Sequence, residues 1–187
     1  MVNRGAEENA RVMPMLILRP LELADADAAL AAQRELDADD FDFLLGYSSK
    51  RGFGEFLEQL NAHEQGIGLP EGWVRSALLG AFVDGTLVGR TSIRYELTSD
   101  LLHVGGHIGY AVRPEFRRRG YAGQILHRSL DVLAARGTEY ALVTCAEENL
   151  ASAKTITRCG GVLDDIVQVG QERTRRYWVS TASGQRL

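Results

Sequence analysis

The chain has 187 residues, is 45% hydrophobic and 25% charged, and carries a formal net charge of −4. These values are typical of one globular domain that buries a sizeable core. The acidic balance argues against nucleic acid as a partner, and no run of about 18 apolar residues suggests a membrane span. The two cysteines follow no metal-ligand or disulfide spacing, so we expect no metal site and a reducing, cytoplasmic setting.

The first third of the chain predicts one strand and two helices. Residues 1–14 are polar and are expected to form a flexible arm before a single domain over 15–187. An apolar run at 15–19 predicts a strand that Pro20 ends, because proline has no N–H to donate. Alanine and leucine with early aspartates predict a helix over 25–36, and helical apolar spacing predicts another over 53–63.

The middle of the chain predicts a three-stranded meander. Asp84-Gly85 lies between two apolar runs at 76–83 and 86–97, which is a strong hairpin signal. A loop through Ser99-Asp100 then leads to a third strand over 107–112.

Helices and strands alternate in the last third. Apolar residues at helical spacing predict a helix over 121–136, and a fully apolar run predicts a buried strand over 141–145. Asn149 is a candidate N-cap for the helix that follows. Gly160-Gly161 ends that helix, and two closing strands are expected over 162–169 and 175–180.

One stretch carries most of the chemistry. The strand over 107–112 runs into Pro114, an arginine-rich turn and Gly120, which opens the next helix. The first N–H groups of a helix have no partner within it and lie at the positive end of its dipole, so a glycine there lets phosphate approach the backbone. Four side chains add positive charge and phosphate donors: Arg113, Arg117, Arg118 and Arg119.

The spacing Arg117-x-x-Gly120-x-Ala122 resembles the coenzyme A pyrophosphate loop of the GNAT acetyltransferases. Asn149-x-x-Ser152 and Gly160-Gly161 resemble the ends of a later helix in that family. The resemblance covers about residues 15 to 180, and its motifs occur in the family's order. It implies an α/β (α+β) fold with a mixed, mostly antiparallel central sheet flanked by helices.

The resemblance implies an acyltransferase that uses acetyl-CoA as co-substrate. It implies that the backbone from Arg118 to Ala122 holds the pyrophosphate and that the backbone of Ala111 and Val112 pairs with the pantetheine arm. Arg113 or Arg117 is expected to reach the 3′-phosphate, with Asn149 and Ser152 near the thiol. The implied cofactor-binding residues are Ala111, Val112, Arg113, Arg117, Arg118, Arg119, Gly120, Tyr121, Ala122, Asn149 and Ser152.

Two positions depart from the family pattern. Ile156 stands where many members have a tyrosine acid, and Thr144 stands where others have a glutamate base. His107 is a candidate base for the amine proton because histidine titrates near pH 6.5, and its alternative is a core histidine with satisfied nitrogens. Tyr110 is expected to serve packing.

The acceptor is expected to be an amine. Residues 21–42 are strongly acidic, which favours a cationic substrate or is a solvated helix face. Phe41, Phe43 and Trp73 are candidates for an acceptor pocket or for the core. We therefore expect an N-acetyltransferase acting on a small-molecule or peptide primary amine, with a homodimer as one oligomeric state. A non-catalytic acyl-CoA-binding module and an arginine-based nucleic-acid binder are the alternatives.

Overall fold

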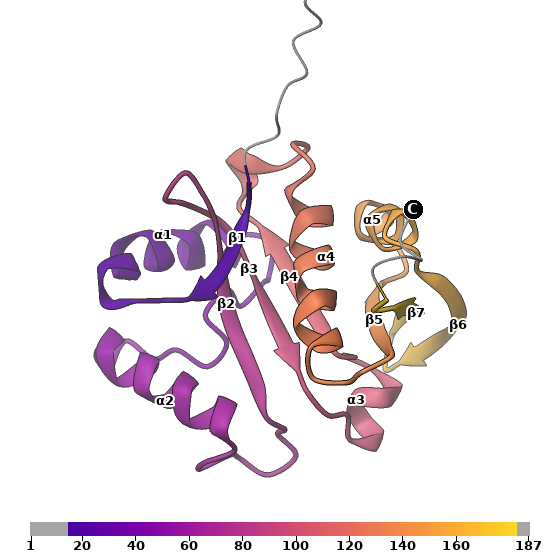
Figure 1. Ribbon diagram of the computed structural model, residues 1–187, viewed down its shortest axis with the longest axis horizontal. Coiled ribbons are helices and arrows are strands. Elements are labelled where there is room, and N and C mark those ends of the chain that lie inside the picture. Colours follow the sequence, from indigo (N-terminus) through magenta and orange to yellow (C-terminus); the bar gives the residue numbers. More distant parts are fainter. Residues whose placement is uncertain (1–14, 183–187) are drawn as a thin grey trace, which may run out of the picture.

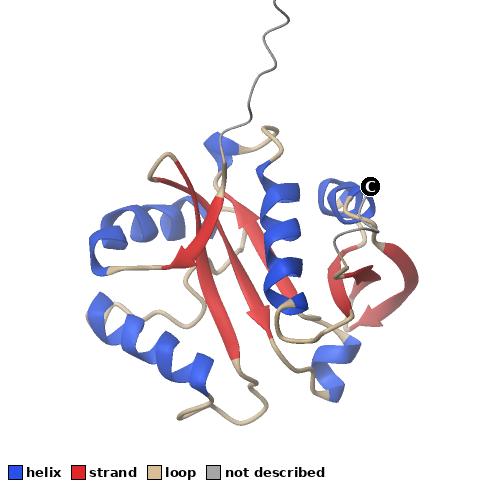
Figure 2. Ribbon diagram, viewed as in Figure 1, coloured by secondary structure: helices blue, strands red, loops and turns tan. Residues whose placement is uncertain are grey.

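Seven strands form one sheet in the computed structural model, which describes residues 15–182 (Figures 1 and 2). The order across the sheet is β1-β2-β3-β4-β5-β7-β6, and within these residues β4 and β5 make its one parallel pair. The mixed, mostly antiparallel sheet expected from the sequence is therefore confirmed. The strands are β1 (Ile17–Pro20), β2 (Ser76–Val83), β3 (Thr86–Arg94), β4 (Ile108–Val112), β5 (Tyr140–Ala146), β6 (Val162–Val169) and β7 (Glu172–Ser180).

Helices cover both faces of this sheet. On one face α1 and α2 pack against Leu78 and Phe82 of β2, while α4 lies on the other face against Ala81 and Val83. Side chains of a strand alternate between faces, which is why β2 can contribute to both layers. Figure 1 shows α1 beside α2, and α5 beside α4. The helices are α1 (Ala26–Asp37), α2 (Phe53–Gln65), α3 (Ser99–His103), α4 (Tyr121–Ala134) and α5 (Leu150–Arg158).

Most predicted elements are present, and some of their bounds differ from the prediction. β1 begins at Ile17 instead of Met15 and ends at Pro20 as expected; Pro20 can be its last residue because β1 is an edge strand, whose outer side has no ladder to complete. The expected loop through Ser99 forms α3, and Thr98 caps it by accepting the N–H of Leu101 at 3.3 Å. β3 ends at Arg94, three residues before the predicted end.

The expected N-terminal arm at 1–14 lies outside the described residues, as do residues 183–187. Between residues 15 and 182, none of the helices has both the length and the apolar character needed to cross a membrane.

Candidate functional site

The site begins where β4 and β5 separate. Their parallel pairing is confined to Ile108 opposite Val143, after which β5 continues beside β7 and β4 continues beside β3. A cavity of about 940 Å³ lies at this separation. Nine of the sequence-predicted residues line it: Ala111, Val112, Arg117, Arg118, Gly120, Tyr121, Ala122, Asn149 and Ser152.

The ladder register decides which backbone groups of β4 face the gap. Arg94 N–H donates to the His107 carbonyl at 2.7 Å, and Arg113 N–H donates to the Val88 carbonyl at 2.9 Å. Alternate residues between these two bonds share their direction, so the N–H and C=O of Ala111 face β3. The prediction that the Ala111 backbone pairs with pantetheine is therefore corrected. The backbone groups of Tyr110 and Val112 are the ones that face the gap.

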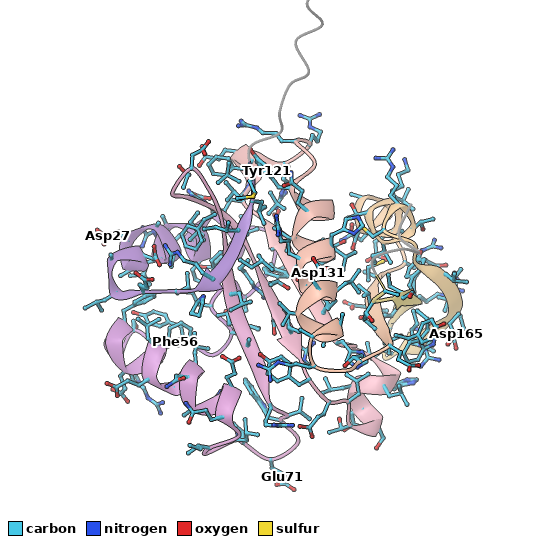
Figure 3. The ribbon with its side chains drawn as sticks, in the orientation of Figure 1. Asp27, Phe56, Glu71, Tyr121, Asp131 and Asp165 are labelled. Carbon is cyan, nitrogen blue, oxygen red and sulfur yellow. The ribbon has the colours of Figure 1, made fainter. Side chains whose placement is uncertain are left out.

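The turn before α4 has the backbone shape expected of an anion site. A short 3₁₀ turn, η2 (Pro114–Phe116), follows β4, and the chain then adopts left-handed conformations at Arg118 (φ 60°) and Gly120 (φ 82°). Such alternation gathers successive N–H groups into a concave nest, and the first N–H groups of α4 lie beside it. Tyr121 begins the helix and is buried at this end of it (Figure 3).

The arginines of this stretch point in different directions. Arg117 lines the cavity, where its Nε donates to the Val112 carbonyl at 3.1 Å and its guanidinium pairs with Asp39. Arg118 also lines the cavity, whereas Arg119 turns back to the Glu115 carbonyl at 2.9 Å.

Arg113 forms an ion pair with Glu35 of α1. Its guanidinium is bidentate on Glu35 at 2.7 and 2.9 Å, and it also donates to the Leu87 carbonyl at 2.9 Å. The side chain is about nine-tenths buried against α1 and does not line the cavity. Because Glu35 already engages two nitrogens of the guanidinium, this geometry favours a role in stability for Arg113. That it reaches the 3′-phosphate stays a prediction, against which this ion pair weighs.

The start of α5 brings three polar groups to the cavity. Asn149 is the predicted N-cap, and its Oδ1 accepts the Ser152 N–H at 3.0 Å. The Ser152 hydroxyl lies 3.0 Å from the hydroxyl of Tyr110, which also lines the cavity. Burial raises the pKa of Tyr110 to about 12, so the phenol is protonated at neutral pH. Strand alternation predicts a packing role for Tyr110, and its contact with α5 depends on long-range geometry that alternation alone does not reveal.

His107 lies outside the cavity lining, at the point where β4 and β5 still touch. Its Nδ1 accepts the Leu142 N–H at 2.9 Å, so the neutral ring carries its proton on Nε2. Burial and the nearby Arg94 lower the pKa of His107. Its catalytic role stays a prediction, and this hydrogen bond weighs against it because the basic lone pair is already occupied.

The wall opposite these groups comes from the end of α1 and the loop after it. Leu36, Asp39 and Phe41 line the cavity, and the acceptor role of Phe41 stays a prediction. Phe43 is fully buried in the core, and Trp73 packs edge-on against His63 with ring centroids 5.5 Å apart. Among the described residues, no group of three His, Cys, Asp or Glu side chains is arranged to hold a metal ion.

Comparison with known proteins agrees with this geometry. The family model described as an acetyltransferase (GNAT) domain matches residues 15–162. The chain belongs to the GNAT acetyltransferase family. It is therefore an acyltransferase by family, and the resemblance seen in its motifs is confirmed.

Solved GNAT structures share the fold at low sequence identity. Mycobacterium smegmatis RimJ in complex with CoA-disulfide is 17% identical with a TM-score of 0.69, covering 90% of this chain and 83% of its own. The Salmonella typhimurium acetyl transferase that modifies the N-terminal serine of a ribosomal protein is 18% identical with a TM-score of 0.66, covering 88% and 94%. A spermidine N-acetyltransferase chimera of Vibrio cholerae SpeG and hSSAT is 17% identical with a TM-score of 0.60, covering 89% and 95%. No curated protein sequence matches the GNAT chain.

Proposed function

We propose that this protein is an acetyl-CoA-dependent N-acetyltransferase that moves an acetyl group to a primary amine by direct attack. The observation that carries the proposal is a single cavity lined both by the α4 turn and by the Tyr110–Ser152 hydroxyl pair. Together these provide a phosphate-binding end and hydrogen-bond donors suited to a thioester. Neighbouring structures with acetyl-CoA or CoA bound support the same co-substrate.

In this proposal the turn holds the coenzyme's diphosphate. The nest at Arg118 and Gly120 and the first N–H groups of α4 donate to its oxygens, and Arg117 adds a charge-assisted hydrogen bond. The gap-facing backbone groups of Tyr110 pair with the amides of the pantetheine arm. The side-chain N–H₂ of Asn149 is available for the same arm, because only its oxygen caps α5.

The chemistry then needs orientation and charge stabilisation. The amine nitrogen attacks the acetyl carbon, a C–N bond forms, and the C–S bond breaks to release a thiolate. Held side by side in the cavity, the two reactants gain most of their rate from proximity, and the Val112 N–H polarises the carbonyl. The amine releases its proton to water.

The hydroxyl pair stabilises the leaving sulfur. Tyr110 donates to Ser152 and the Ser152 proton turns to the thiolate, a chain the 3.0 Å contact allows. With a pKa of about 12, Tyr110 keeps its proton against a thiolate whose thiol titrates near about 8.5, so the pair acts by hydrogen bonding.

An amine acceptor fits the opposite wall. Phe41 and Leu36 offer apolar contact. The neighbours named for spermidine and for a ribosomal protein N-terminus support a small-molecule or peptide amine. A homodimer and a cytoplasmic location stay predictions, the first of which light scattering on a sizing column would test.

Two measurements test the function. Calorimetry with acetyl-CoA should give micromolar binding that an Arg117→Glu, Gly120→Glu variant loses and an Arg119→Glu variant keeps. Arg119 is the matched control because it belongs to the same turn but does not line the cavity.

The second measurement is transfer itself. Thiol release and a mass increase of the acceptor are followed over a panel of polyamines, amino acids and peptides with free N-termini. Binding without transfer to any amine would favour the non-catalytic module, and failure of the native chain to bind would contradict the proposed function.

A further inference from the structure

Arg90 of β3 is a fully buried arginine held by backbone oxygens. Its Nε donates to the Phe43 carbonyl at 3.1 Å and one terminal nitrogen donates to the Asp42 carbonyl at 2.9 Å. The other terminal nitrogen donates to the Gly109 carbonyl of β4 at 3.1 Å. Within residues 15–182 it makes no ion pair, and burial lowers its pKa to about 9, so it stays cationic at neutral pH.

A buried cation without a paired carboxylate is costly, so its position calls for an explanation. The guanidinium lies across the ring of Phe41, with its carbon 4.6 Å from the ring centroid. Phe41 lines the cavity, whereas Arg90 is only 3% exposed and lies behind it. The arginine therefore cannot contact a ligand, but it supports a side chain that can.

The segment that Arg90 contacts has no regular secondary structure, so contacts from other elements must hold its conformation. Residues 38–47 belong to the segment 38–52 that joins α1 to α2, and this segment has no helix or strand of its own. Within them Asp40 adopts φ 53° and Leu45 φ 22°, which side chains with a Cβ rarely occupy. A second tie comes from Gln33, whose Oε1 accepts the Leu44 N–H at 2.7 Å.

The contact of Arg90 with the Gly109 carbonyl lies beside the gap between β4 and β5. Gly109 immediately precedes Tyr110, whose backbone faces the separation of β4 and β5. A Cβ built at Gly109 would have a single neighbour within 4 Å, the Arg90 terminal nitrogen at 3.9 Å. One guanidinium thus spans the distance from the strand that carries the coenzyme contacts to the loop that carries Phe41.

We propose that Arg90 is a positioning residue that sets the acceptor wall, holding Phe41 and residues 38–47 at a fixed distance from β4. The proposal rests on the proposed function, since it takes the wall at Phe41 as the amine side of the cavity. It assigns Arg90 to acceptor specificity and not to coenzyme binding, because the coenzyme turn makes no contact with it.

The test compares Arg90→Met with Arg90→Lys. The methionine variant keeps the volume and loses every donor, so the amine KM should rise about tenfold or more while the acetyl-CoA Kd changes less than about twofold. Lysine restores the charge on one donor nitrogen, which cannot reach all three carbonyls, and should recover part of the KM. Equal changes in amine KM and coenzyme Kd, or no change in either, would overturn the proposal.

Two further arms keep the test decisive. If Arg90→Met does not fold, Phe41→Ala removes the wall directly and should raise the amine KM without moving the acetyl-CoA Kd. Hydrogen exchange needs no activity: in Arg90→Lys, amides in 38–47 should exchange faster while those at the start of α4 do not. Unchanged exchange in 38–47 would contradict the anchoring role even if the wild-type chain acetylated no amine.

Discussion

Glu35 and Arg113 stand 78 residues apart in the chain and form a bidentate pair at 2.7 and 2.9 Å. Glu35 lies in the last turn of α1, and Arg113 follows β4 directly. Asp39 and Arg117 repeat the arrangement four residues further along both segments. Glu35 in the last turn of α1 and Asp39 just beyond that helix therefore meet two arginines of the segment that follows β4.

The inner pair predicts a pH-dependent contribution to stability. The Arg113 guanidinium lowers the pKa of Glu35, so the unfolded chain binds the proton more tightly than the folded one. The stabilisation is then present above about pH 4.5 and is lost as the pH falls through the lowered value. Glu35→Gln should reduce the free energy of unfolding by about 1 kcal/mol at pH 7 and by less below pH 4.

Urea unfolding at both pH values measures this difference. The control is Glu55→Gln, which removes an exposed carboxylate 3.6 Å from Arg51, where an ion pair contributes little. A Glu35→Gln loss that is the same at pH 7 and pH 3.5 would show that the charge of Glu35 is not its source.

Substitutions of Arg113 and Arg117 should differ in their effect on the affinity for acetyl-CoA. Arg117→Gln removes a charged donor from the cavity and should weaken acetyl-CoA binding about tenfold or more, since such hydrogen bonds contribute about 1.5–3 kcal/mol. Arg113→Gln should leave the Kd within about twofold while lowering the unfolding midpoint, because its donors are engaged by Glu35 and the Leu87 carbonyl. Calorimetry at two salt concentrations decides, and equal losses of affinity would return Arg113 to the phosphate site.

Asp39 should compete with the coenzyme for Arg117. Its carboxylate pairs with the guanidinium that the diphosphate requires, so binding must displace or share it. Asp39→Asn should tighten acetyl-CoA binding about two- to fivefold. Asp37→Asn is the control, because Asp37 is exposed and does not line the cavity. Weaker coenzyme binding in Asp39→Asn would mean that the carboxylate orients Arg117 for the phosphate instead of competing with it.

The sequence predicts most of the fold because local patterns determine most of it. The Asp84-Gly85 turn, the Asn149 cap and the apolar stripe of α4 are each contained within a few residues. α3 was missed because it is five residues long and rests on a single Thr98 cap.

The site was less predictable from the sequence because contacts between residues far apart in the chain determine where its side chains point. Spacing in the sequence pointed to Arg117, Arg118 and Gly120, and all three line the cavity, while their role in coenzyme binding stays a prediction. The direction of Arg113 depends on Glu35, and the contact of Tyr110 depends on Ser152, each far away in the chain. Ladder register likewise determines that Val112 and not Ala111 faces the gap, which alternation without a known partner strand leaves open.

Variants of His107 can distinguish a structural role of this residue from a catalytic one. Its Nδ1 accepts the Leu142 N–H at the last contact between β4 and β5. Desolvation lowers the pKa of the ring, so the unfolded chain binds its proton first and stability falls as the pH drops below about 6.5. The sequence-based hypothesis of a general base expects His107→Ala to lower turnover at least tenfold with unchanged coenzyme affinity.

The hydrogen bond favours a structural role with a different outcome. His107→Ala leaves the buried Leu142 N–H without its acceptor, which should cost about 1–3 kcal/mol of unfolding free energy. His107→Asn supplies a short acceptor and should recover part of that stability, with turnover near that of the wild type. The pH–rate profile between pH 5 and 8 is the deciding measurement, because a base leaves an acidic limb that disappears in both variants. A tenfold loss of turnover in His107→Asn together with loss of that limb would establish His107 as the base, since a purely structural histidine changes stability without changing the shape of the profile.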